Sequence, residues 1–255
     1  MTSRPAPLWP VPEGATERLA LAKAYPFFIP EESFLLLDGA VRPLDPAADG
    51  LFAGRVPVLA VGSNQSPDQL RRKFAHLPAP VAVPVTRAWL ADFDVVYAAH
   101  VTRYGSIPGN LCPAPGARVR LSVTWLDPDQ LAAMHATEIS GGSYVFGRLG
   151  GLDLAIDGGP VLREAYGYVS LQGCLRQDGG PISLAAIRAE GRFFPSLSQE
   201  AMLERLRRRC GSSRPLDDFI LETIADLALR RDRTRRLRED CLPFDWTNLE
   251  VIEAG

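Results

Sequence analysis

The most regular pattern along the chain is an alternation of apolar and polar side chains between residues 118 and 125. An extended strand points successive side chains to opposite faces, so this period of two predicts a β-strand. One face carries Val119, Leu121, Val123 and Trp125. Further strands are predicted at residues 56–61, 81–85, 93–99, 144–149, 152–156 and 165–171. Gly150-Gly151 and residues 157–160 are predicted to be turns between strands.

The pattern turns helical in the last part of the chain, from about residue 183 onward. The best helix candidates there are residues 199–209 and 216–238. Several strands followed by helices, rather than a regular alternation of the two, favour an α+β fold with a helical C-terminal part.

Residues 1–54 are rich in Pro and Ala and contain two apolar patches, at residues 25–30 and 34–37. Patches as apolar as these are not expected to hang free in water. We therefore expect this segment to be an arm that packs on the main body or on a partner chain.

A strand, a small turn and a helix start follow one another in the segment that begins at residue 56. The turn is residues 62–64, Gly-Ser-Asn, and Gly62 permits unusual dihedrals and a close approach to the backbone. In the helix start, Ser66 can serve as N-cap, Pro67 as first helical residue, and Gln69 as partner of Ser66 in a capping box. Free N–H groups at such a site can hold a carboxylate or phosphate. The alternative is an ordinary strand-to-helix connection.

The same cap chemistry recurs in residues 127–131, Asp-Pro-Asp-Gln-Leu, so a second helix is predicted to begin there. On that helix Leu131, Met134 and Glu138 share one face. A carboxylate aimed at the core is costly unless it is paired, hydrated or used. Partly desolvated, Glu138 would have a raised pKa and could act as a general base near neutral pH. Alternatively, the helix frays before Glu138 at the Ser-Gly-Gly sequence 140–142 and leaves the side chain in water.

The charge and composition limit the classes of partner. A net charge of −2 over 255 residues argues against a general polyanion binder. The arginine-rich stretches at 205–209 and 230–238 have acidic residues among or beside them, which favours salt-bridged, solvated helix faces over nucleic-acid binding. No apolar stretch is long enough to suggest a membrane span. The Pro-rich start lacks the apolar core of a signal peptide.

Few other chemistries are indicated. Cys112, Cys174, Cys210 and Cys241 form no C-x-x-C pair and are interpreted as reduced thiols of a cytoplasmic protein. The three histidines, His76, His100 and His135, are isolated, so no metal site is expected. The chain contains no G-x-S-x-G elbow, no G-x-G-x-x-G motif and no Walker loop. We therefore expect no serine hydrolase, dinucleotide or nucleoside triphosphate chemistry.

The order of these motifs resembles the γ-glutamylcyclotransferase-like family, which includes the AIG2-like proteins. Along the chain these are the Gly-Ser-Asn turn with its helix, residues 107–116, the strand ending at Trp125, the helix carrying Glu138, and residues 142–144. The resemblance covers about residues 56–172, and residues 196–220 are similar to the family's late helix and its exit. It implies an α+β fold built on a mixed β-barrel with flanking helices. The implied division is an N-terminal arm at 1–54, a cyclotransferase-like domain at 55–220, and a helical C-terminal extension at 221–255.

The resemblance also implies a site. The substrate-binding loop of the family falls on Val61, Gly62, Ser63 and Asn64, whose backbone N–H groups would hold the substrate's α-carboxylate. The catalytic Glu falls on Glu138, and a tyrosine of the site falls on Tyr144. In the family reaction the substrate's α-amine attacks its own γ-carbonyl, which releases 5-oxoproline and an amine. Glu138 would be the general acid/base, and no metal or cofactor is required. A second Tyr-Gly-Ser sequence, at 104–106, is set aside because no apolar strand leads into it.

Three departures from the family pattern keep two hypotheses open. Val61 stands where the family usually has Tyr, residues 134–137 replace its usual Leu-Asp, and Ile139 replaces the Gly after the catalytic Glu. The first hypothesis is an enzyme that acts on a γ-glutamyl amine or a related small amide. The second is a catalytically inactive family member that serves as a small-molecule-binding or protein-interaction module. Either would have a small molecule as partner, no nucleic acid and no membrane, and a homodimer is compatible with both.

Overall fold

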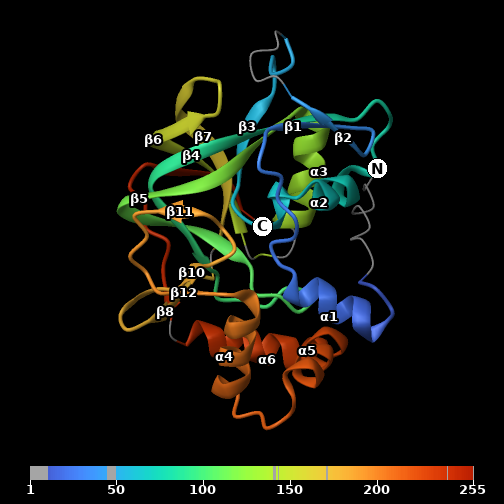
Figure 1. Ribbon diagram of the computed structural model, residues 1–255, viewed down its shortest axis with the longest axis vertical. Coiled ribbons are helices and arrows are strands. Elements are labelled where there is room, and N and C mark those ends of the chain that lie inside the picture. Colours follow the sequence, from blue (N-terminus) through green and yellow to red (C-terminus); the bar gives the residue numbers. More distant parts are fainter. Residues whose placement is uncertain are drawn as a thin grey trace.

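Five strands close into a barrel at the centre of the molecule (Figure 1). The computed structural model describes residues 11–44, 50–139, 142, 144–170, 172–239 and 241–254. The barrel strands are β3 (Val56–Ala60), β4 (Ala82–Tyr97), β5 (Gly109–Leu126), β6 (Tyr144–Ile156) and β7 (Val161–Ser170). They pair in the order β5-β3-β7-β6-β4, and β4 pairs again with β5. The β3–β7 pair is parallel and the others are antiparallel. The predicted α+β class and mixed barrel are confirmed.

Shorter strands extend the sheet beyond the barrel. On this sheet lie β1 (Phe34–Leu37), β2 (Ala40–Pro43), β10 (Ser183–Leu184), β11 (Ala189–Glu190), β12 (Ser196–Leu197) and β14 (Leu249–Ala254). A small second sheet holds β8 (Cys174–Gln177), β9 (Gly180–Pro181) and β13 (Cys241–Leu242). The helical part, expected from about residue 183, begins only at Gln199, because residues 183–197 pair with the barrel strands and with each other.

Most of both faces of the alternating strand, residues 118–125, is buried, and only Arg118, at the start of the polar face, is exposed. Val119, Leu121 and Val123 belong to the main apolar core. The rest of the polar face is covered, and its buried side chains Arg120, Ser122 and Thr124 form hydrogen bonds within the protein. Ser122 Oγ accepts a hydrogen bond of 2.6 Å from Arg87, and Thr124 Oγ1 donates one of 3.1 Å to the Val58 carbonyl.

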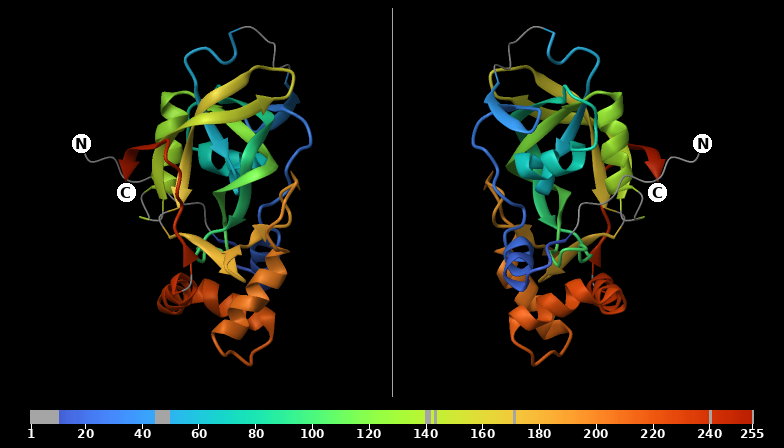
Figure 2. Two further views of the ribbon diagram at one scale, coloured as in Figure 1. Left: turned by 90° about the vertical axis from the view of Figure 1, so that its left-hand side faces the viewer. Right: turned by 90° about the vertical axis from the view of Figure 1, so that its right-hand side faces the viewer.

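Two helices start at the predicted prolines and pack together on one side of the barrel (Figures 1 and 2). They are α2 (Pro67–Phe74) and α3 (Pro128–Glu138). At α3 the Asp127 carboxylate and the Gln130 amide form the predicted capping box. At α2 the predicted box between Ser66 and Gln69 is absent. A 3₁₀ turn precedes α2, and its Ser63 carbonyl already accepts the Ser66 N–H at 2.9 Å, so this N–H needs no side-chain cap.

Two other expectations require correction. Gly150-Gly151 is not a turn: β6 continues through it with a bulge, and Gly151 has a φ of +70°. The bulge lets the C-terminal segment approach, since the Gly150 N–H donates to the Asn248 carbonyl at 3.0 Å. The helix predicted at 216–238 is broken into α5 (Leu216–Ala225) and α6 (Leu227–Arg238). Asp226 causes the break, because its carboxylate caps the N–H groups that open α6.

Helix α1 (Ala15–Lys23) of the arm and the C-terminal helices lie together below the barrel in Figure 1, whereas the arm's strands β1 and β2 lie at the opposite end, where β1 pairs with β4. The arm's helix α1 packs on α5, and Lys23 forms ion pairs with Glu200 of α4 (Gln199–Arg209) and with Asp217 of α5. The predicted boundary at 220/221 falls inside α5, and the extension beyond it contains β13 and β14 as well as α6. In the described part of the chain, no helix combines the length and the apolar character needed to cross a membrane.

The arm's strand predicts a measurable difference between two phenylalanines. Phe34 of β1 is 2% exposed, whereas Phe28 is 71% exposed. Phe34→Ala should lower the free energy of unfolding by about 3 kcal/mol, because it empties a core position. Phe28→Ala, the matched control, should change it by less than about 0.5 kcal/mol. Urea unfolding followed by circular dichroism measures both, and equal effects would show that β1 does not dock on the barrel.

Candidate active site

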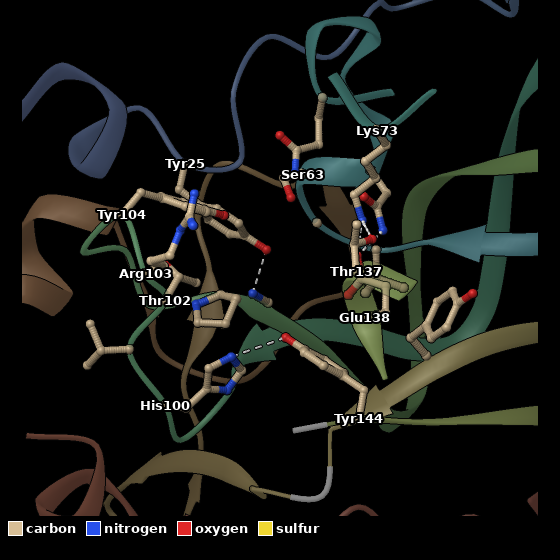
Figure 3. A pocket seen from close by; sticks show the side chains of 18 of the residues that line it. Tyr25, Ser63, Lys73, His100, Thr102, Arg103, Tyr104, Thr137, Glu138 and Tyr144 are labelled. Carbon is tan, nitrogen blue, oxygen red and sulfur yellow. Dashed lines mark hydrogen bonds and ion pairs between the residues drawn. The ribbon is translucent and has the colours of Figure 1, made fainter. Parts of the chain in front are cut away.

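A cavity of about 320 Å³ lies between three parts of the fold (Figure 3). These are the 3₁₀ turn η1 (Ser63–Gln65), the loop 98–108 between β4 and β5, and the C-terminal end of α3. The six site residues expected from the sequence all line it: Val61, Gly62, Ser63, Asn64, Glu138 and Tyr144. Residues 64 and 138 are far apart in the sequence but close in space. They meet because β3 leads into η1, β5 leads into α3, and the two strands are neighbours in the barrel.

Glu138 lies on the wall of this cavity and is tied down on one side. Asn64 Nδ2 donates a hydrogen bond of 3.0 Å to Glu138 Oε1, and the Lys73 ammonium forms an ion pair with the same oxygen. Lys73 is itself buried, with 3% of its side chain exposed, and it also donates to Thr137 Oγ1 at 2.8 Å. Because both partners reach Oε1, the second carboxylate oxygen is the one that can face a ligand.

The charge of Glu138 differs from the expectation. Burial alone raises the pKa of the Glu138 carboxyl, but the charge and hydrogen bond of Lys73, with the hydrogen bond from Asn64, outweigh it and hold the pKa below its usual value. The predicted raised pKa is therefore wrong, because the sequence pattern did not show the ammonium opposite. At neutral pH the group is a partly buried carboxylate.

The end of α3 decides between the two readings of Glu138. The helix runs through Glu138, and the Ile139 N–H still donates to the His135 carbonyl at 2.9 Å. The alternative in which the helix frays before Glu138 is wrong, since Ile139 is buried and anchors the last turn. The expected break at Ser140 and Gly141 lies outside the described residues.

The arm contributes a side chain that the motifs did not indicate. The Tyr25 hydroxyl accepts a hydrogen bond of 2.7 Å from the Gly109 N–H and points into the cavity (Figure 3). It lies 2.0 Å from the place where a Cβ on Gly62 would stand. The close approach that Gly62 was expected to allow is therefore made by Tyr25.

Around His100 the wall is largely aromatic, and Arg103 of the same loop also lines it (Figure 3). His100 Nε2 lies 3.4 Å from the Tyr144 hydroxyl (Figure 3). Burial, together with the charge of Arg238, lowers the pKa of His100 to about 4, so the imidazole is neutral at pH 7. Tyr104, whose motif was set aside, and Tyr168 also line the cavity.

Some of these residues carried a signal in the sequence and others did not. Lys73 shares the buried face of α2 with Leu70 and Phe74, so the argument that singled out Glu138 could also have found Lys73. Tyr25 had no such signal, because its partner Gly109 is 84 positions away. Among the described residues, no three His, Cys, Asp or Glu side chains gather as ligands of a metal ion.

Comparisons with known proteins report similarity in fold. No family model and no curated protein matches the chain. A solved gamma-glutamyl cyclotransferase is similar at 14% identity and a TM-score of 0.38, covering 78% of this chain and 94% of that one. An uncharacterized protein from Homo sapiens has 15% identity and a TM-score of 0.37, covering 78% and 95%. An Arabidopsis thaliana protein solved in solution has 18% identity and a TM-score of 0.35, covering 46% and 70%.

The buried ion pair predicts how stability depends on pH. In the wild type, the lowered pKa of Glu138 means that the pair stabilises the fold above the ordinary Glu pKa, about 4.3, and that this contribution is lost on acidification. Lys73→Met leaves a buried carboxylate without its cation, which raises the pKa instead. The variant should then lose stability as pH rises from 4 to 7, and be less stable than the wild type by about 3 kcal/mol at pH 7.

Urea unfolding at several pH values measures this difference. Lys23→Met is the matched control, because it removes ion pairs at the surface, where they contribute less than about 1 kcal/mol. A Lys73→Met variant whose stability relative to the wild type is independent of pH would contradict the pairing.

Proposed function

We propose that the protein is a γ-glutamylcyclotransferase-like enzyme that cyclises a γ-glutamyl amine or a related small amide and releases 5-oxoproline. One observation carries the proposal: the ionised Glu138 carboxylate lies on the cavity wall beside the 62–64 turn, with Asn64 hydrogen-bonded to it. The order of motifs along the sequence supports the same reaction. The free thiols of all four cysteines fit the cytoplasmic location included in the proposal.

The site suits the α-ammonium group of such a substrate. Asn64 Nδ2 is occupied by Glu138, which turns Asn64 Oδ1 the other way. This oxygen is buried and has no hydrogen-bond partner among the described residues. The Asn64 amide oxygen and the neighbouring Glu138 carboxylate are both hydrogen-bond acceptors. An ammonium group has only donors, so it is the kind of group that this pair of acceptors would bind.

The reaction needs little beyond positioning and proton management. Glu138 takes a proton from the α-ammonium, and the freed amine nitrogen attacks the γ-carbonyl carbon. The new C–N bond closes a five-membered ring, and collapse of the tetrahedral oxyanion breaks the bond to the leaving nitrogen. Glu138 returns its proton to that nitrogen, and the regenerated carboxylate passes the second hydrogen of the ring nitrogen to the departing amine, so the products are 5-oxoproline and the protonated amine. Because the attack is intramolecular, the cavity mainly has to hold the substrate folded.

The lowered pKa of Glu138 has a consequence for this mechanism. A carboxylate held ionised by Lys73 is a weaker base than a free one, and the buried ammonium of Lys73 offsets this by stabilising negative charge nearby. Between pH 5 and 8 the carboxylate is already charged. In that range the rate should rise with pH because of the substrate's own amine, and not because of Glu138.

Glu138→Gln tests the role of the carboxylate. The amide retains the shape of the side chain but cannot accept the α-ammonium proton, so kcat for 5-oxoproline release should fall by roughly 10² to 10⁴. A panel of γ-glutamyl amides and dipeptides, assayed by chromatography of 5-oxoproline, measures it. Glu164→Gln, at an exposed ion pair with Arg148, is the control and should leave the rate unchanged.

Two outcomes would contradict the proposal. A Glu138→Gln variant with wild-type turnover would remove Glu138 from the mechanism. Wild-type protein that releases no 5-oxoproline from any member of the panel would favour the binding-module hypothesis, with Val61 and the altered residues 134–139 as the reasons.

A further inference from the structure

Tyr25 joins the N-terminal arm to the cavity described above. Its side chain is 4% exposed, and its hydroxyl lies in a slot between Gly62 and Gly109. A Cβ at Gly62 would stand 2.0 Å from the hydroxyl oxygen, and one at Gly109 would stand 3.5 Å from it. The missing Cβ of Gly62 thus makes room for one oxygen atom from a distant segment, whereas a Cβ at Gly109 would be in ordinary contact with it.

The hydrogen bond of this hydroxyl is directional. Its oxygen accepts the Gly109 N–H at 2.7 Å. This contact does not use the hydroxyl's own hydrogen. A donor on the oxygen polarises its O–H bond and makes it a stronger donor. The hydrogen is therefore available to an acceptor on a ligand in the cavity.

The rest of the arm holds Tyr25 in place. Lys23, two residues before it, pairs with Glu200 and Asp217 on the C-terminal helices. The Ser106 hydroxyl donates to the Ala22 carbonyl at 2.9 Å. After it, the Phe27 ring packs against Tyr104 with ring centres 5.8 Å apart. The cavity keeps its volume of about 320 Å³ with Tyr25 in its wall, so the side chain borders the space and does not fill it.

We propose that Tyr25 is a binding residue that donates its hydroxyl hydrogen to the carboxylate of the ligand, so that the arm completes the site. The proposal rests on the proposed function, because it takes the ligand to be an α-amino acid group whose ammonium faces Glu138. Glu138, with Asn64 hydrogen-bonded to it, lies across the cavity from Tyr25 (Figure 3). The polarised hydroxyl on the cavity wall supplies a donor of the kind that a carboxylate needs.

The test compares two probes that differ only in the carboxylate. One is γ-L-glutamylethylamide, and the other is 4-amino-N-ethylbutanamide, which lacks the α-carboxylate. Binding is measured by isothermal titration calorimetry in the Glu138→Gln background, where turnover does not interfere. Adding Tyr25→Phe should weaken binding of the first probe about tenfold or more, the effect of losing a hydrogen bond to a charged group. Binding of the second probe should change less than twofold.

A matched control separates this role from a structural one. Tyr97 is also fully buried, and its hydroxyl donates to the Leu197 carbonyl at 3.0 Å away from the cavity lining. Tyr97→Phe should leave the ratio of the two dissociation constants unchanged. If Tyr25→Phe does not fold, Gly62→Ala is the second variant, because its Cβ displaces the same hydroxyl. It should weaken binding of the probe that carries the carboxylate and leave binding of the other probe nearly unchanged. In a double variant that carries both Tyr25→Phe and Gly62→Ala, the two losses of binding free energy should not add, because each substitution removes the same contact.

The results distinguish this proposal from the proposed function. If Tyr25→Phe weakens binding of both probes equally, or weakens binding of neither, the proposed role of Tyr25 is overturned, even if the wild type releases 5-oxoproline. Selective weakening of the carboxylate probe supports it even if the wild type releases none. Failure of the wild-type site to bind γ-L-glutamylethylamide more tightly than the butanamide also overturns it.

Discussion

The pairing of β4 with β5 is the constraint on which the rest of the structure depends. The two strands run antiparallel from Val85 opposite Thr124 to Tyr97 opposite Gly109, with one bulge near Asp92. At one end their pairing closes the barrel, since both strands also pair with other members of the ring. At the other end it fixes the loop 98–108 over the cavity, opposite the end of α3. A slip of one residue would turn the core side chains of β5 outward and move this loop away from Glu138.

The site depends on charges that are buried together. Lys73 and Glu138 come from two helices that pack on each other outside the barrel, and each would be costly in the interior without the other. Their pairing keeps the carboxylate ionised and holds one of its oxygens, while Asn64 orients the same group from the turn. The same contacts that stabilise the two helices therefore also determine which oxygen can meet a ligand.

The N-terminal arm and the C-terminal helices lie outside the barrel, and together they position one side chain of the cavity wall. The C-terminal helices hold α1 through the ion pairs of Lys23 and through apolar packing. Helix α1 in turn leads directly to Tyr25, whose hydroxyl lies against Gly62 and Gly109. The arm and the tail thus act together on the cavity wall, although one precedes the barrel in sequence and the other follows it.

The sequence by itself determined the elements whose signal is local. The alternation at 118–125 identified β5, and the proline caps identified the first residues of α2 and α3. Face periodicity singled out Glu138 on α3. Tertiary structure decided the properties that depend on distant partners: Gly150-Gly151 became a bulge because the C-terminal segment packs there, and the pKa of Glu138 fell because Lys73 faces it. Tyr25 entered the site for the same reason. A hydrogen bond across 84 positions leaves no periodic trace in the sequence, whereas a helix face or a strand alternation does.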